Sequence, residues 1–562
     1  MLFCHFPETY VDLLSRFGQA SAMRRSLPII LILSCVMAAG YYLVSSNHFS
    51  SETDEKEAPS AVRLSGKHSF EKDIDDYARL LRLPSLAIGV ARGDSLVFFK
   101  GAGTPNSLCK ESLTPDHIFP IASITKSFTA VALKQMEGEG KLSLKDPVSM
   151  YPNEYFTEER WDPQTTLAQI ISHTSESDPP GTQFVYNGGK FNIVFNVFSA
   201  LSKTRVPGDL TRPFTDEIQS RILTPLKMDH TLLRFAGKEH GHLKKWVAQT
   251  YRLDDSAGKF VPAEVEPDNL QSGPGYGMMS SVNDLVTYSS ALSQHHLLTA
   301  AQYEQITLPF YPGSPYGMGW FTSEFEGTKI HWVYGYGDND ASLLLRVPAY
   351  DLTLIMLAPC ALPSASIRLG YGNPFNSLLV CSFFKNFVQA TSTGSRLHIE
   401  EKFAKAATLS FLPASFHPDA SAADSLLRRL MGDFPSDTIW QTPAAFEVVA
   451  SSEDRDILKF GLKMAEKYLR QDKLHPVIAW YAGLICQKNG EQEKAIACFE
   501  PLGWGDQYRE QPYKFNAMME LAKRHMYLAP RHAREILKDL MRFKEYINVN
   551  DQQYRDAEEM LK

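Results

Sequence analysis

A serine and a lysine three residues apart, Ser123 and Lys126, are the side chains in this sequence best suited to covalent chemistry. Positions i and i+3 of a helix share one face, so the amine can lie over the hydroxyl without help from other elements. A neutral amine there can accept the hydroxyl proton while the oxygen attacks a carbonyl. The start of a helix adds free N–H groups, which favour an oxyanion. The spacing predicts that Ser123 is a nucleophile and Lys126 its base.

The same Ser-x-x-Lys spacing occurs five times in the chain, so the surrounding sequence has to distinguish this pair. Pro120 precedes it, and an apolar run with helical periodicity follows and ends at Gly138 and Gly140. These signals predict a helix that begins at the pair. On this stretch alone, a helix-capping serine followed by a solvated lysine stays the alternative. The other four copies begin at Ser69, Ser107, Ser256 and Ser382.

The composition describes a globular protein of more than one domain. A chain of 562 residues predicts roughly two to four domains. Charged residues make up 22% and the net charge is -7, so nothing supports nucleic-acid binding. The seven cysteines show neither metal-ligand spacing nor a disulfide framework, which is typical of core thiols. We therefore expect no metal and no cofactor.

An uncharged apolar run, residues 27–44, follows several arginines and precedes an acidic stretch. This pattern predicts a membrane segment with its N-terminus in the cytoplasm. A chain that started at Met23 would instead carry a signal peptide, and Cys35 weakly resembles a lipoprotein processing site. All three interpretations export the rest of the chain, and a buried hydrophobic helix is the fourth. The expected segments are a short cytoplasmic N-terminus (1–26), a transmembrane or signal segment (27–45) and a linker (46–66).

The middle of the chain predicts strands and short helices that could position Ser123 and Lys126. Two short strands flank Arg92-Gly93-Asp94, and residues 316–357 contain β-rich segments separated by turns, which predict an antiparallel sheet. Tyr186 lies in a Gly-rich loop ahead of an apolar helix, where it could point into a cleft. A core tyrosine is the alternative. His173 is more typical of a structural histidine.

From Asp454 onward the pattern is helical, with no strand signal. Residues 480–499 predict a helix-turn-helix pair, and a looser echo follows about 38 residues later, which favours roughly two tetratricopeptide-like repeats. So few units cannot form a long solenoid, so we expect them to pack on a neighbouring element or on a partner. We also expect this domain, 454–562, to contribute nothing to the chemistry. A connector, 396–453, would precede it.

Taken together, these stretches resemble the serine β-lactamase-related family of class C β-lactamases, DD-peptidases and esterases, over about residues 75–390. The resemblance implies an α+β fold, with an antiparallel sheet flanked by helices, in a hydrolase domain at 67–395. It also implies an acyl-enzyme on Ser123 with Tyr186 as proton shuttle. The matching pieces are Ser123-Ile-Thr-Lys126, 140–147, 167–175, Tyr186-Asn187-Gly188, 222–226, Met279-Ser280 with Asp284-Leu285, 316–319 and 342–348.

Two motifs depart from the family pattern. Its third motif falls at Val333-Tyr334-Gly335, where the usual Lys or His is absent, and the Asn expected two residues after Tyr186 is Gly188. The lost cation would weaken selection for substrates with a carboxylate and leave the pKa of Lys126 more dependent on burial. The expected substrate contacts are Asn187, Val333, Tyr334, Gly335 and Tyr336, the last through its backbone N–H in the oxyanion hole.

These observations favour a membrane-tethered serine hydrolase with its catalytic domain outside the cytoplasm, periplasmic or extracellular. Its substrate would be a small-molecule or envelope-derived ester or amide, with β-lactam hydrolysis doubtful. The alternative is a hydrolase-like scaffold with a vestigial site, which binds protein partners through its helical repeats.

Overall fold

The computed structural model describes residues 67–106, 111–151, 164–177, 179–202, 211–233, 241–263, 272–365, 367–388, 395–470, 475–503, 512–542 and 551–561. The segments expected at 1–26, 27–45 and 46–66 lie outside this part of the chain. Within it, no helix combines the length and the apolar character needed to cross a membrane.

A six-stranded antiparallel sheet forms the centre of the hydrolase part, in the order β2-β1-β10-β9-β8-β7. Every residue of β9 and β10 is buried, and in β1 only the last residue is exposed, as expected for central strands between two layers of helices. Gly93 takes a φ of 57° in the turn of the predicted β1–β2 hairpin. The strands are β1 (Ser85–Arg92), β2 (Ser95–Gly103), β7 (Phe321–Phe325), β8 (Thr328–Tyr336), β9 (Ala341–Val347) and β10 (Leu352–Ala358).

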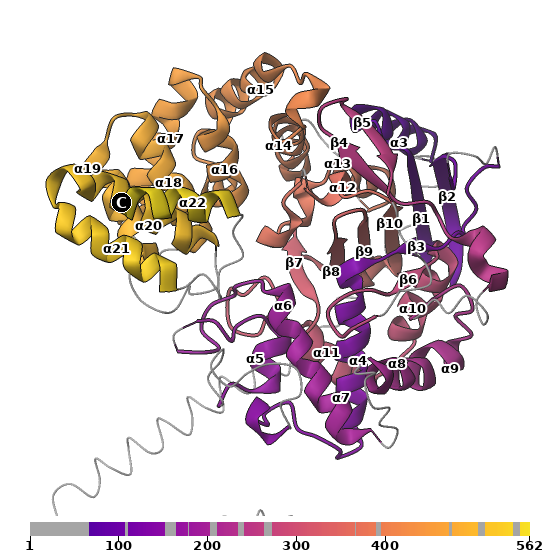
Figure 1. Ribbon diagram of the computed structural model, residues 1–562. Coiled ribbons are helices and arrows are strands. Elements are labelled where there is room, and N and C mark those ends of the chain that lie inside the picture. The colour runs from indigo at the N-terminus through magenta and orange to yellow at the C-terminus, as the bar shows by residue number, and fades with distance from the viewer. Residues whose placement is uncertain are drawn as a thin grey trace, which may run out of the picture. The chain divides into compact units, whose positions relative to one another are not determined.

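Helices cover both faces of this sheet, so the α+β fold expected from the sequence is confirmed (Figure 1). On one face, Phe128 of α4 and Tyr288 of α10 stack at 3.9 Å inside the larger apolar core. On the other, Phe70 of α3 packs 5.2 Å from Phe98 of β2. The helices of this part are α3 (Lys67–Leu80), α4 (Thr125–Gly138), α5 (Leu167–Ile171), α6 (Gly188–Phe191), α7 (Phe195–Leu201), α8 (Arg212–Ile218), α9 (Thr224–Leu226), α10 (Val282–Ser293), α11 (Ala300–Thr307), α12 (Leu362–Ala365), α13 (Leu378–Phe383) and α14 (Arg396–Ser410).

Two short pairings lie outside the main sheet. The strands β3 (Phe119–Pro120) and β6 (Met279–Ser280) pair just before the start of α4, and β4 (Tyr251–Asp254) pairs with β5 (Lys259–Pro262). Because β3 ends three residues before Ser123, its pairing with β6 fixes where the chain enters the site.

The C-terminal region is helical, as the sequence predicts (orange to yellow in Figure 1). Gly490, with a φ of 78°, ends α18, and α19 packs back so closely that a Cβ on Gly483 would stand 2.2 Å from the Phe499 ring. A second pair, α20 and α21, follows. The helices are α15 (Ala420–Asp433), α16 (Pro443–Ser451), α17 (Arg455–Tyr468), α18 (Pro476–Lys488), α19 (Gln492–Gly503), α20 (Pro512–Leu528), α21 (Pro530–Arg542) and α22 (Asp551–Leu561).

One apolar core runs through this helical region and reaches into the hydrolase part. Apart from Val185, its buried members extend from Ile399 to Ala557, so residues of the expected connector and of the expected repeat domain share it. Val185, which directly precedes Tyr186, belongs to the same core. The repeats therefore pack on a neighbouring element, one of the two outcomes expected from the sequence.

Candidate active site

Ser123 and Lys126 meet at the start of a helix. Ser123 lies in the short 3-10 turn Ala122–Ile124, which leads directly into α4. The Lys126 Nζ stands 2.8 Å from the Ser123 Oγ and donates to the Gly275 carbonyl oxygen at 2.7 Å. Lys126 is only 2% exposed, whereas Ser123 is half-buried. The geometry predicted from the i, i+3 spacing is therefore present, with the serine accessible and the lysine enclosed.

The turn that carries the serine is held from several directions. Ala122 has a φ of 41°, a conformation that residues with a side chain rarely adopt. The Thr125 hydroxyl donates to its carbonyl at 2.6 Å, and the Ser342 hydroxyl of β9 donates to the Ile121 carbonyl at 2.8 Å. A Cβ on Gly335 would stand 2.4 Å from the Ile121 oxygen, so only glycine lets β8 come this close. The edge of β8 thus lies against the nucleophile turn.

Burial lowers the pKa of Lys126 to about 7. Desolvation disfavours the charged ammonium, and it is the sole cause of the shift. The rings of Tyr186 and Phe191 stand 5.3 and 5.4 Å from the nitrogen, where water would otherwise solvate it. The amine is therefore substantially neutral near pH 7. The base depends on burial, as the loss of the cation in the third motif led us to expect.

Tyr186 completes the group around the serine. Burial raises its pKa to about 12, against a smaller opposing effect of the nearby Ser123 side chain, so the phenol keeps its proton at neutral pH. The His173 ring packs 4.2 Å from the Tyr186 ring, and its Nδ1 accepts from the Asn187 backbone N–H at 3.2 Å. Burial, with Lys126 nearby, holds the pKa of His173 well below its usual value. This neutral histidine packs against the tyrosine ring, and its role as a structural residue stays a prediction.

The second motif is used differently from the family pattern. The Asn187 side chain caps α6, because its Oδ1 accepts from the Lys190 N–H at 2.9 Å and its amide donates to Glu176. A Cβ on Gly188 would stand 3.7 Å from the Lys126 Nζ, so this glycine leaves the space beside the base open. With its side chain occupied in this way, the role of Asn187 as a substrate contact stays a prediction.

Near Gly275, a residue that sequence reasoning did not single out supports the base. The Asn192 Oδ1 accepts from the Gly275 N–H at 2.9 Å and so fixes the peptide whose carbonyl receives the Lys126 amine. Asn192 lies four residues after Gly188 along the same helical stretch. A polar asparagine close to the second motif was the only signal in the sequence. The sequence could not show which group it binds, because its partner Gly275 is 83 residues away.

The third motif, residues 333–336, contributes tyrosine side chains to the site but no cationic side chain. Val333 is 2% exposed and belongs to the apolar core, whereas the Tyr334 ring stands 6.2 Å from the Tyr186 ring. Tyr336 is 56% exposed at the end of β8. Burial of Val333 leaves little of its side chain for a ligand to touch. The substrate contacts expected at 333–336 stay predictions, and the accessible ones among them are Tyr334 and Tyr336.

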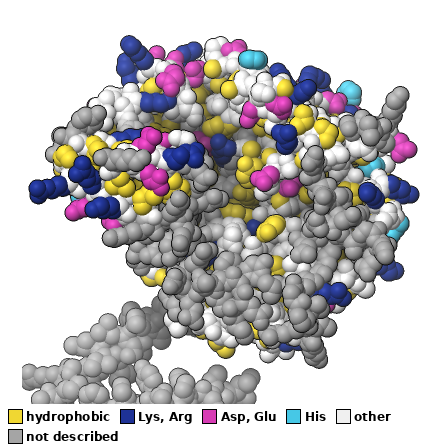
Figure 2. Space-filling model, in the orientation of Figure 1, with side chains coloured by type: hydrophobic (Ala, Val, Ile, Leu, Met, Phe, Trp, Pro, Cys, Tyr) yellow, Lys and Arg dark blue, Asp and Glu magenta, His cyan; other side chains and the backbone are white. Residues whose placement is uncertain are grey.

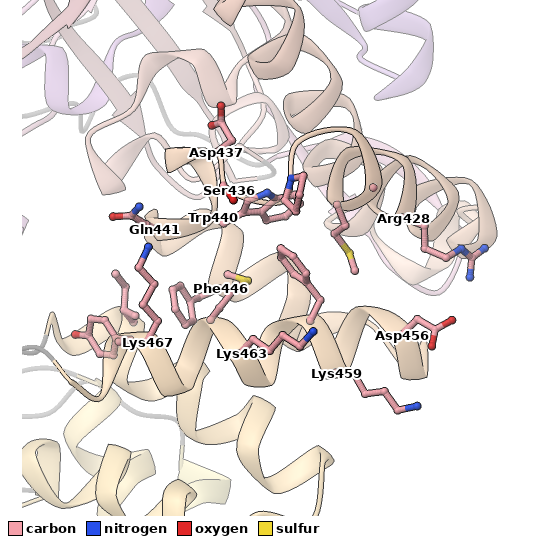
Figure 3. Close-up of a pocket in the computed structure, with 17 residues that line it drawn as sticks. Arg428, Ser436, Asp437, Trp440, Gln441, Phe446, Asp456, Lys459, Lys463 and Lys467 are labelled. Carbon is pink, nitrogen blue, oxygen red and sulfur yellow. The ribbon is translucent and has the colours of Figure 1, made fainter.

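A cavity of about 430 Å³ opens beside Tyr186. Hydrolase residues such as Phe184 and Tyr311 form one side, and the rest of its lining comes from the helical region. A larger cavity, about 840 Å³, lies within the helical region between α15, α16 and α17 (Figure 3). Of Ser123, Lys126 and Tyr186, only Tyr186 lines the smaller cavity, and none of the three lines the larger one, so the smaller cavity adjoins the site through Tyr186.

An antiparallel sheet between two helical layers, with a serine and a buried lysine at the start of a helix beside the sheet edge, defines the β-lactamase and penicillin-binding class of proteins. The chain belongs to the beta-lactamase family, whose profile matches residues 70–366. Proteins of this fold family are serine hydrolases of the peptidase and amidase type.

Named relatives are distant and longer than the matching region. Protein flp of Staphylococcus aureus (strain MW2) is 25% identical over 319 residues, and the match covers 49% of this chain and 59% of that protein. An unguisins hydrolase of Aspergillus campestris is 24% identical over 330 residues, with coverage of 49% and 58%. The chain thus spans less than two thirds of the length of both relatives.

The matches to solved structures also cover about half of this chain. The octameric penicillin-binding protein homologue from Pyrococcus abyssi is 22% identical with a TM-score of 0.46, and the match covers 52% of this chain and 73% of that chain. A D-stereospecific amidohydrolase from Streptomyces sp. is 19% identical with a TM-score of 0.43, with coverage of 54% and 95%.

Proposed function

We propose that this protein hydrolyses a neutral ester or amide through an acyl-enzyme on Ser123. The observation that carries the proposal is the 2.8 Å contact between the Ser123 Oγ and a lysine amine whose pKa burial lowers to about 7. An amine in that state is a base at neutral pH, and its position over the hydroxyl is the one that general-base catalysis needs.

In the proposed mechanism, neutral Lys126 takes the Ser123 proton as the oxygen forms a bond to the substrate carbonyl carbon. The carbonyl oxygen becomes an oxyanion, held by the backbone N–H groups of Ser123 and Tyr336, each worth on the order of 3 kcal/mol. Tyr186 gives its proton to the leaving group as the bond to that group breaks, and regains one from Lys126. Water then attacks the acyl-enzyme by the reverse sequence of proton transfers and releases the acid.

The expected substrate is uncharged near the scissile bond. The described residues that line the cavity beside Tyr186 include no Lys, Arg, Asp or Glu. With an apolar valine at position 333, the edge of β8 also lacks the cation that would pair with a carboxylate. These features favour esters and amides over β-lactams and D-alanyl peptides.

The test compares turnover of p-nitrophenyl butyrate with turnover of a chromogenic cephalosporin. Wild-type protein should hydrolyse the ester with burst kinetics and the cephalosporin far more slowly, and Ser123→Ala should do neither. If Ser123→Ala still hydrolyses the ester, Ser123 is not the nucleophile and the proposal is wrong.

We further propose that the hydrolase is tethered to a membrane and faces away from the cytoplasm. The support is the uncharged run at 27–44 with arginines before it. Protease added to intact cells or spheroplasts should digest the catalytic part. Full protection, together with activity of a cytosolic reporter fused after Lys562, would contradict this placement.

A second candidate function is partner binding through the helical region. The cavity of about 840 Å³ has an apolar floor that includes Trp440 and Phe460, and Lys459, Lys463 and Lys467 follow one another along α17 (Figure 3). This combination suits an acidic amphipathic helix of a partner protein, since lysines at i, i+4 and i+8 present one charged rim. Lys463→Glu with Lys467→Glu should release such a partner, and Lys538→Glu on α21 is the matched control. Retention by the double variant would exclude this surface.

A further inference from the structure

The cavity beside Tyr186 is shared between the two halves of the described chain. Phe184, Tyr186 and Tyr311 line it from the hydrolase part. Further lining comes from the helical region, at the starts of α16, α18 and α20, where Pro443, Pro476 to Ile478 and Tyr513 face the same space. On the face seen in Figure 2, hydrophobic side chains gather where the helical region meets the sheet.

A buried polar network fixes this wall in place. The Arg368 Nε donates to the Glu447 carboxylate at 2.9 Å, and the Tyr371 hydroxyl donates to the same carboxylate at 2.8 Å. The Glu447 side chain is 7% exposed, so the carboxylate is shielded from water, whereas Arg368 is 34% exposed. Tyr371 and Tyr513 of α20 both line the cavity, and each influences the pKa of the other. The two bonds to Glu447 tie α16 to the segment that carries Tyr371, beside the cavity.

The wall carries no net charge at neutral pH. Burial raises the pKa of Tyr371 and of Tyr513, so both phenols keep their protons. Burial lowers the pKa of His475 to about 4, which makes its imidazole neutral. The His475 Nδ1 has no hydrogen-bond partner among the described residues. A charged group would lose its hydration here without finding an opposite charge.

We infer that the helical region forms the specificity wall of the active site, where Val477, Tyr513 and their neighbours receive an apolar, uncharged group attached to the scissile ester or amide. The inference rests on the proposed function, because it assigns a substrate class to the same site. A volume of about 430 Å³ is within the range of small-molecule sites, roughly 300–1,000 Å³. On this inference the helical region takes part in substrate selection, whereas the expectation that it contributes nothing to the chemistry stays a prediction.

The experiment fills the cavity from the helical side in the full chain. Val477→Trp places an indole in the space, and Leu484→Trp on the same helix, which lines neither cavity, is the matched control. We would measure kcat/KM for p-nitrophenyl esters from acetate to decanoate and for butyrates of phenol and naphthol. Val477→Trp should lower kcat/KM at least tenfold for the large esters of either the acyl series or the leaving-group series. It should lower kcat/KM less than twofold for the acetate ester. Leu484→Trp should leave kcat/KM unchanged for all of these esters.

A second variant keeps the test informative if Val477→Trp fails to fold. Val477→Ala enlarges the space and should shift the optimum toward larger groups by two- to fivefold in kcat/KM. A hemisuccinate ester should remain a poor substrate in every variant. The inference would be wrong if a folded Val477→Trp kept the wild-type size selectivity. It would also be wrong if kcat/KM fell equally for every ester, acetate included.

Labelling of Ser123 by a fluorophosphonate separates the two proposals. If wild-type protein is labelled at Ser123 and the Val477 variants do not change size selectivity, the wall fails and the hydrolase stands. If wild-type protein is not labelled, the proposed function fails, and the wall fails with it.

Discussion

The reacting centre and the cavity wall are built in opposite ways. Ser123 and Lys126 are brought together by one turn of helix, and Lys126 Nζ reaches the serine at 2.8 Å through local backbone geometry. The wall that includes Val477 and Tyr513 exists only because helices far along the chain pack against the hydrolase part. The contact between the two reacting groups is thus local, whereas the selectivity that we propose would depend on long-range packing. Changes in the first region should affect every substrate, and changes in the second should affect some.

The largest effect is expected from removal of the reacting pair. Ser123→Ala should lower kcat by on the order of 10⁴-fold or more for every ester, because no acyl-enzyme can form. Lys126→Ala should cost nearly as much, and the double variant should be no worse than either single one, since the two groups act as a unit. Steady-state kinetics on three esters of different size checks this. Losses that multiply in the double variant would show that the two side chains act independently.

Removal of the Tyr186 hydroxyl should come next. Tyr186→Phe keeps the ring that packs against His173 but removes the hydroxyl near Ser123. A lost proton relay typically costs about 10²- to 10³-fold in kcat. The loss should grow as the leaving group becomes more basic, from a nitrophenol to an aliphatic alcohol. An equal loss for both leaving groups would assign the tyrosine to packing alone.

The pH dependence of kcat/KM should reflect only the protonation of the reacting centre, and not the cavity wall. Lys126 must be neutral to accept a proton, and burial lowers its pKa to about 7. Below that pH the amine is protonated, so kcat/KM should fall about tenfold per unit, to roughly a hundredth at pH 5. Val477→Trp should leave this limb where it is. A flat profile between pH 5 and 9 would contradict the assignment of Lys126 as base.

The smallest effect is expected from Gly188→Asn, which restores the asparagine that the family pattern has in the second motif. Gly188→Asn places a Cβ 3.7 Å from the Lys126 Nζ, within ordinary contact, and brings a carbonyl that can accept from the ammonium. Such a bond favours the charged amine and should shift the acidic limb upward by about half a unit to one unit, with a few-fold loss at pH 7. Gly189→Asn, whose Cβ would meet only the Asn187 Oδ1, is the control. An unshifted limb would mean that the amide does not reach the base.

The same contrast explains how much could be predicted from the sequence. The Ser123–Lys126 contact, the antiparallel sheet and the α18–α19 pair follow from local spacing, turn residues and periodicity, and all three are present. Val333 was chosen by counting back from Pro348, but its exposure depends on the pairing of β8 with β9, which sets Val333 opposite the buried Leu344. The cavity wall left no signal, because residues 476–478 at the start of α18 are apolar whether they line a cavity or fill a core.

One measurement tests the central claim most directly. Wild-type protein and Ser123→Ala are incubated with a fluorophosphonate, and intact-mass spectrometry is followed by peptide mapping. We expect a single adduct on wild-type protein, on the peptide that contains Ser123, and none on Ser123→Ala. An adduct on a peptide that lacks Ser123, or equal labelling of both proteins, would contradict the account.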